Sequence, residues 1–75
     1  MKVRRELEET VARAIGQLPE TQREVLLLAH YEQMPLAEIA QVLEIEVTAV
    51  KSRLQRARAA LKQTLAVYVA GEETE

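Results

Sequence analysis

The chain has 75 residues and a formal net charge of −2, and this length suits one small domain over residues 1–75 with a core of modest size. The apolar spacings described below predict that this domain is all-α. It has no Cys, no apolar run near the roughly 18 residues of a membrane span, and Glu residues before its first apolar stretch. We therefore expect no disulfide, thiolate metal site, membrane span or signal peptide. Hydrophobic residues make up 48% of the sequence but none is Phe or Trp, so the core should be aliphatic.

The charges are spread unevenly along the chain. Residues 47–63 contain five Lys or Arg and no acidic residue, whereas residues 1–46 contain nine Glu against five basic residues. A plain solvated helix face is one interpretation of such a stretch, but solvated faces usually mix both signs. A face of a single sign favours contact with a polyanion, whatever the net charge of the whole domain.

The first predicted element is an amphipathic helix over residues 3–15. Its apolar residues follow the spacing of one helical face: Leu7, Val11, Ala14 and Ile15. Gly16 should end this helix, because glycine adopts the left-handed conformation at a helix C-terminus without a Cβ clash.

The second predicted helix covers residues 19–31. Pro19 suits the first turn of a helix, and Glu20 complements the positive end of the helix dipole. The apolar run Val25–Leu28 marks this helix as the central, most buried one. We expect all four residues of the run in the core; the alternative is that some of them line a groove for a partner.

A third helix, residues 35–43, should begin at Pro35, because proline disfavours helical backbone in the residue before it. Ala40 is small, which allows another helix to cross closely. Residues 44–46 form the next turn, with Ile45 as the apolar plug beneath it.

The fourth predicted helix spans residues 47–69, roughly 33 Å at 1.5 Å per residue. Its buried side should follow the i, i+4, i+7 spacing of Val50, Leu54, Ala57, Leu61, Leu65 and Tyr68. The acidic stretch 71–75 is expected to lie outside the helix as a tail.

The last two helices and their tight turn predict a helix-turn-helix, in which the second, recognition helix enters the major groove of DNA. Its first two turns expose one face whose side chains are expected to contact bases: Lys51, Ser52, Gln55 and Arg56. Lys and Arg can donate to guanine O6 and N7, Gln can pair with adenine, and Ser accepts several partners. Flanking side chains are expected to contact phosphates: Thr48, Arg53 and Arg58.

The sequence gives little support for an enzyme. His30 is the single His, there is no Asp, and the lone glycines cannot form a phosphate-binding loop. We therefore expect neither catalysis nor a metal or cofactor.

Three stretches resemble region 4 of bacterial sigma-70-type transcription initiation factors, in particular the extracytoplasmic-function group: LPETQREVLLL, LAEIAQVLEI and VKSRLQRARAAL. The last is the most specific, since it fits Val-(Lys/Arg)-Ser-Arg-Leu-x-Arg-Ala-Arg-x-x-Leu. The resemblance covers residues 18–65. It implies a four-helix, monomeric, cytoplasmic domain that reads the promoter −35 element and docks on the β-flap of RNA polymerase, with an anti-sigma factor as a further candidate partner. It implies base-reading roles for the same four residues that the helical face selects.

Several positions depart from that family pattern. Glu44 stands where Gly is usual, Glu46 where Pro or Ser is common, and Ala29 where a basic residue is common. Both Glu residues should repel the DNA backbone, so we expect weak DNA affinity for the domain alone. A complete factor of this family also has a domain that melts the −10 element, so the chain is expected to be an excised domain or a stand-alone relative.

Two other functions fit the sequence. One is a protein-interaction module whose helical faces bind polymerase or an anti-sigma factor with little DNA binding of its own. The other is the DNA-binding domain of a different helix-turn-helix protein, such as a two-component response regulator, although such proteins lack the Ser-Arg-Leu-x-Arg-Ala-Arg run.

Overall fold

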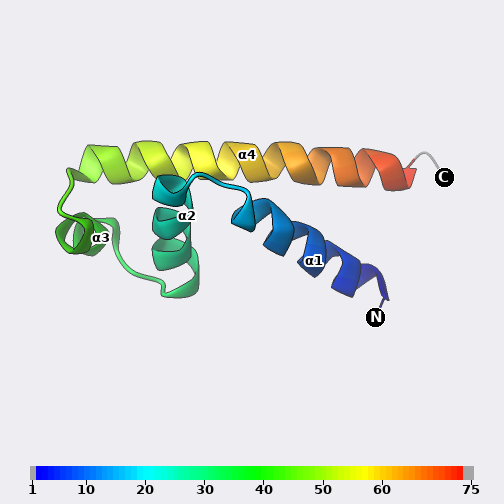
Figure 1. Cartoon of the computed structure of the whole chain (residues 1–75), viewed down its shortest axis with the longest axis horizontal. Coiled ribbons are helices and arrows are strands. Elements are labelled where there is room, and N and C mark those ends of the chain that lie inside the picture. The colour runs from blue at the N-terminus through cyan, green and yellow to red at the C-terminus, as the bar shows by residue number, and fades with distance from the viewer. Residues whose placement is uncertain (1, 74–75) are drawn as a thin grey trace.

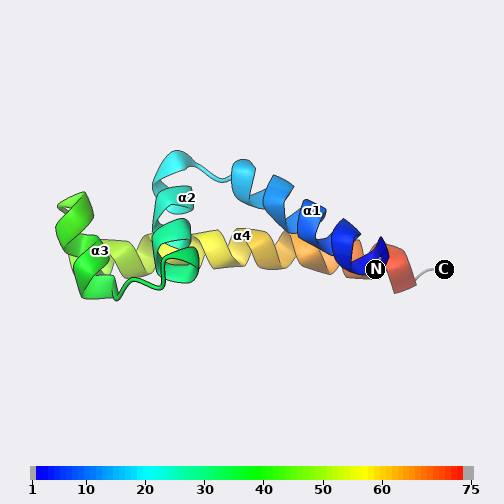
Figure 2. The same ribbon diagram turned by 90° about the horizontal axis from the view of Figure 1, so that it is seen from below.

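The computed structural model describes the backbone of residues 2–73 and the side chains of residues 5–66. Within them the chain is helical and contains no strand, in the order α1 (Lys2–Gly16), α2 (Glu20–Leu26), a π-helical turn η1 (Leu27–Tyr31), α3 (Leu36–Leu43) and α4 (Val47–Glu73). Helix α4 runs the length of the molecule, and the other helices lie along one side of it (Figure 1). Figure 2 shows α3 and α2 beside the first half of α4 and α1 beside its second half. The predicted all-α, four-helix fold with a helix-turn-helix and a long C-terminal helix is confirmed.

The core is aliphatic and is built around the first half of α4. Helix α4 contributes Val50, Leu54 and Ala57, which follow the spacing of one helical face and are all buried. The shorter helices contribute the side chains that pack against them: Leu18, Val25, Leu26, Ile39 and Ala40. Leu61 is half-buried against this cluster, and the side chain of Tyr68 lies outside the described residues. The facing of α4 that its apolar spacing predicts is therefore confirmed for the buried residues in its first half.

The second helix differs from its prediction in its last turn. Residues 27–31 form a π-helical turn, in which the N–H of Glu32 donates to the carbonyl of Leu27 at 3.2 Å. Val25 and Leu26 are buried, but Leu27 is 37% exposed, so the prediction that the whole run lies in the core is wrong at Leu27. Four consecutive residues point in directions that span most of the circumference of a helix. The core covers only one side of this short helix, so the four side chains cannot all be buried.

The turn between α3 and α4 is a Schellman motif. The N–H of Ile45 donates to the carbonyl of Ala40 at 3.0 Å, and the N–H of Glu44 donates to the carbonyl of Gln41 at 3.3 Å. Glu44 takes the left-handed position of the motif, with φ 56° and ψ 47°. Ile45 packs against the core from below the turn, as predicted. A non-glycine residue in this conformation costs about 1 kcal/mol, so the backbone is strained at Glu44, where the resemblance described above leads us to expect Gly.

Two helix ends depart from the predictions. Gly16 is the last residue of α1 and is not left-handed; instead Arg23 Nη1 donates to its carbonyl at 3.1 Å and caps that helix end. Helix α4 continues through Gly71 to Glu73, beyond the predicted end at 69. Ala and Glu favour helix, and one glycine costs only about 1 kcal/mol, so Gly71 does not end it. The rest of the predicted tail, residues 74–75, lies outside the described residues.

Candidate nucleic-acid interface

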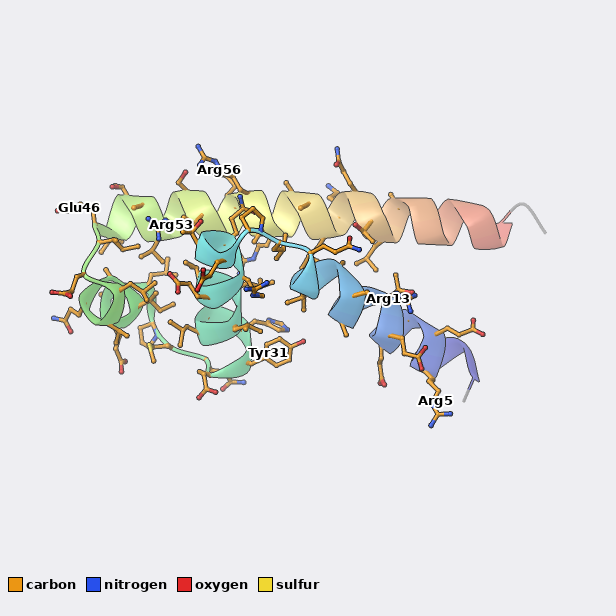
Figure 3. All side chains as sticks on the ribbon, in the orientation of Figure 1. Arg5, Arg13, Tyr31, Glu46, Arg53 and Arg56 are labelled. Carbon is orange, nitrogen blue, oxygen red and sulfur yellow. The ribbon has the colours of Figure 1, made fainter. Side chains whose placement is uncertain are left out.

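The exposed face of α4 carries the predicted base-contacting residues. Lys51, Gln55 and Arg56 are exposed, and Ser52 is half-buried. They lie on the side of α4 away from the buried residues, and Arg56 points away from the other helices (Figure 3). The turn places α3 beside the start of this face, so the two helices can approach a groove together. The structure brings all four predicted residues onto the second and third turns of α4.

The predicted phosphate-contacting residues lie in three different environments. Thr48 is exposed in the first turn of α4. Arg53 lies on the flank of α4 that faces α2, with its Nη1 atom 4.0 Å from Oε1 of Glu24. Arg58 lies on the opposite flank and is exposed. The two arginines are five residues apart, which is about 140° around the helix on the buried side, so they lie at the two edges of the wider exposed face.

The charges on this face favour a polyanion. Among the described residues, Lys51, Arg56 and Arg58 form no ion pair, so their positive charges are available to a ligand. Glu44 and Glu46 are exposed at the start of α4, and Figure 3 shows Glu46 at this end of the helix. Their carboxylates interact favourably with the positive end of the α4 dipole, but they would repel a DNA backbone that approaches this end of the helix.

Two hollows adjoin Arg58 on its flank of α4. One, of about 380 Å³, lies between the start of α3 and α4 and is lined by Leu36, Lys51, Leu54, Gln55 and Arg58. The other, of about 190 Å³, lies among α1, α2, η1 and α4 and is lined by Val11, Ile15, Leu26, His30, Tyr31, Arg58 and Leu61. His30 and Tyr31 pack edge-to-face, with ring centroids 5.3 Å apart. The apolar spacing of the helices gave no signal for either hollow, because each is formed by residues far apart in the chain.

The described residues contain no cluster of three or more His, Asp, Glu or Cys side chains that could hold a metal ion. Within the same part of the chain, no helix is both long enough and apolar enough to cross a membrane.

A family described as "Sigma-70, region 4" matches residues 8–61 of the chain. The chain belongs to the sigma-70 region 4 family. It is 38% identical over 60 residues to the ECF RNA polymerase sigma factor SigW of Bacillus subtilis. These 60 residues make up 80% of this chain and 32% of that protein. It is 41% identical over 63 residues to the RNA polymerase sigma-H factor of Pseudomonas aeruginosa, covering 84% of this chain and 33% of that protein. This region 4 domain thus spans about one third of the length of these relatives.

The match places the candidate interface inside the region 4 homology. Residues 8–61 include the helix-turn-helix and every predicted DNA-contacting residue, from Thr48 to Arg58. They also include the residues that line the hollow beside His30 and Tyr31. The last turns of α4, beyond residue 61, lie outside the region 4 match.

Proposed function

We propose that this region 4 domain binds promoter DNA in transcription initiation and reads the −35 element through the exposed face of α4. The observation that carries the proposal is the position of Lys51, Gln55 and Arg56 opposite the buried side of α4, with no ion pair to either cation among the described residues. The major groove admits one helix, and its pattern of donors and acceptors distinguishes all four base pairs.

Each side chain has a role that its chemistry supports. Lys51 and Arg56 would donate to guanine O6 and N7, Gln55 would pair with adenine, and Ser52 would accept or donate at its half-buried position. Contacts to the sugar-phosphate backbone would fix the register of the helix in the groove and come from Thr48, Arg53 and Arg58.

The domain alone should bind DNA weakly. Glu44 and Glu46 are exposed beside the reading face and would repel phosphates at the start of α4. In the cell, contact with RNA polymerase would supply the remaining affinity by raising the local concentration of the domain at the promoter.

A selection from randomised duplex DNA tests this function. The proposal predicts that the protein enriches one short motif, more strongly when the β-flap of RNA polymerase is present. Recovery of unrelated sequences at every salt concentration, with and without the β-flap, would contradict it.

A second site supports docking on the β-flap of RNA polymerase. The hollow beside His30 and Tyr31 has mostly apolar walls, and one of its lining residues, Tyr31, is 59% exposed; Leu27, also exposed, belongs to the same π-helical turn. Such a patch is typical of a protein-binding surface. We propose that it receives the β-flap, that an anti-sigma factor would compete for it, and that the domain acts as a cytoplasmic monomer.

Replacing Tyr31 tests the docking site. Tyr31→Ala should weaken binding to an isolated β-flap domain by more than about five-fold, because truncating an aromatic interface anchor removes a large buried area. Tyr31→Phe should bind nearly as well, because it keeps the ring. Equal β-flap affinity of the alanine variant and the unchanged protein would place the docking surface elsewhere.

A further inference from the structure

Glu24 and Arg53 join α2 to the recognition helix by an ion pair. Their charged atoms, Oε1 and Nη1, are 4.0 Å apart, and the two side chains are 40% and 29% exposed. The side chain of Arg53 is therefore mostly covered, and it lies on the side of α4 that faces the shorter helices (Figure 3). Arg53 has a restricted position in the protein before any ligand binds.

The pair leaves the donors of Arg53 available. At 4.0 Å, Nη1 is beyond hydrogen-bonding distance of the Glu24 carboxylate, so the contact is one of charge. A guanidinium group has five N–H donors in a planar fork, and it can contact a carboxylate on one edge and a phosphate on another. Glu24 can thus restrict the position of the Arg53 side chain while its N–H donors remain available to a phosphate.

We propose that Glu24 is a positioning residue for DNA binding: it holds the Arg53 guanidinium on the α2 flank of the recognition helix, ready to clamp a phosphate of the backbone beside the groove. This inference rests on the proposed DNA-binding function. It assigns a role in DNA binding to Glu24, a residue of α2 that carries a negative charge, as DNA does.

The acidic charge of Glu24 has two opposite effects on DNA binding. A phosphate on the far edge of Arg53 would lie roughly twice as far from Glu24 as Arg53 does, where repulsion near physiological salt weakens binding by about two- to three-fold. Immobilising a long, freely rotating side chain on binding weakens it by about two- to ten-fold. Because Glu24 removes part of this second, larger cost in advance, its net effect should be favourable.

A double-mutant cycle measures this effect. The probe is a fluorescently labelled duplex of mixed sequence, which suffices because phosphate contacts do not depend on sequence, and the readout is its anisotropy near physiological salt. The variants are Glu24→Ala, Glu24→Gln, Arg53→Ala and the double variant Glu24→Ala/Arg53→Ala. Glu20→Ala is the matched control, since Glu20 is an exposed acid on the same helix. Thermal melting of each variant checks that it folds.

We expect Glu24→Ala and Glu24→Gln to weaken DNA binding by about two- to five-fold when Arg53 is present. In the Arg53→Ala background, Glu24→Ala should cause no further loss, and Glu20→Ala should cause no loss in either background. Tighter or unchanged binding by both Glu24 variants, or an equal loss with and without Arg53, would overturn the positioning role. Failure of the unsubstituted protein to bind the duplex at any salt concentration would overturn the proposed function itself, and this inference with it.

Discussion

The N–H of Ile45 donates a hydrogen bond of 3.0 Å to the carbonyl of Ala40, and this bond closes the turn that sets the direction of α4 relative to α3. The bond requires the residue between α3 and Ile45 to be left-handed, and that residue is Glu44. The angle between α3 and α4 is thus held by a Schellman motif whose left-handed residue, Glu44, is strained.

Glu44→Gly should relieve this strain. Glycine adopts the left-handed conformation without a Cβ clash, so the free energy of unfolding should rise by about 1 kcal/mol. For a domain of this size that corresponds to a rise in the melting temperature of roughly 4–8 °C. Glu38→Gly is the matched control, because Glu38 is exposed within α3 and glycine there should lower stability by about 0.5–1 kcal/mol. A lower melting temperature for Glu44→Gly would show that its side chain stabilises the turn.

Leu54→Ala should destabilise the fold by roughly 2–5 kcal/mol in urea denaturation, because truncating a buried leucine leaves a cavity among its neighbours. Leu54 is 5% exposed and belongs to the buried cluster around the first half of α4. Val42→Ala, at a residue of α3 that is 58% exposed, should change stability by less than about 0.5 kcal/mol. Equal stability of the Leu54 and Val42 variants would mean that α4 is rotated from its position in the structure.

The apolar spacing of the sequence predicted the helices, the facing of α4 and which of its residues are exposed; the DNA-binding roles of those residues stay a prediction. Val50, Leu54 and Ala57 fix one buried side of α4, and Lys51, Gln55 and Arg56 must then lie on the exposed side. These predictions succeeded because a helix has a fixed rotation per residue, so one buried position orients its neighbours.

The features that the sequence did not predict depend on contacts across the fold. Gly16 is not left-handed, and Arg23, seven residues further on, donates to its carbonyl and caps the end of α1. Leu27 is exposed because no neighbouring helix covers its side of α2 and η1. The contact between Glu24 and Arg53 joins two helices that are separated by the whole of α3. Spacing along one helix carries no information on any of these.

Arg58→Ala tests the division between base and phosphate contacts. If Arg58 contacts a phosphate, its removal should weaken binding to all duplex sequences and reduce the slope of log affinity against log salt by about one. The measurement is a salt titration on the selected motif and on an unrelated duplex. Because Arg58 also lines both hollows, unchanged DNA binding together with weaker β-flap binding would assign it to the partner surface instead.

The most direct test of the proposed reading face is a selection from randomised duplex DNA with Arg56→Ala, beside the unsubstituted protein and Lys62→Ala. Lys62 is exposed on the same helix but lies six residues beyond Arg56, so its loss removes one charge and leaves the four residues of the reading face in place. We predict that Arg56→Ala loses the preference at one or two adjacent base pairs, a cost of about 1–3 kcal/mol for the preferred bases, and keeps the rest of the motif. The Lys62→Ala protein should select the full motif. Enrichment of the same full motif by Arg56→Ala would contradict the claim that the exposed face of α4 reads the DNA sequence.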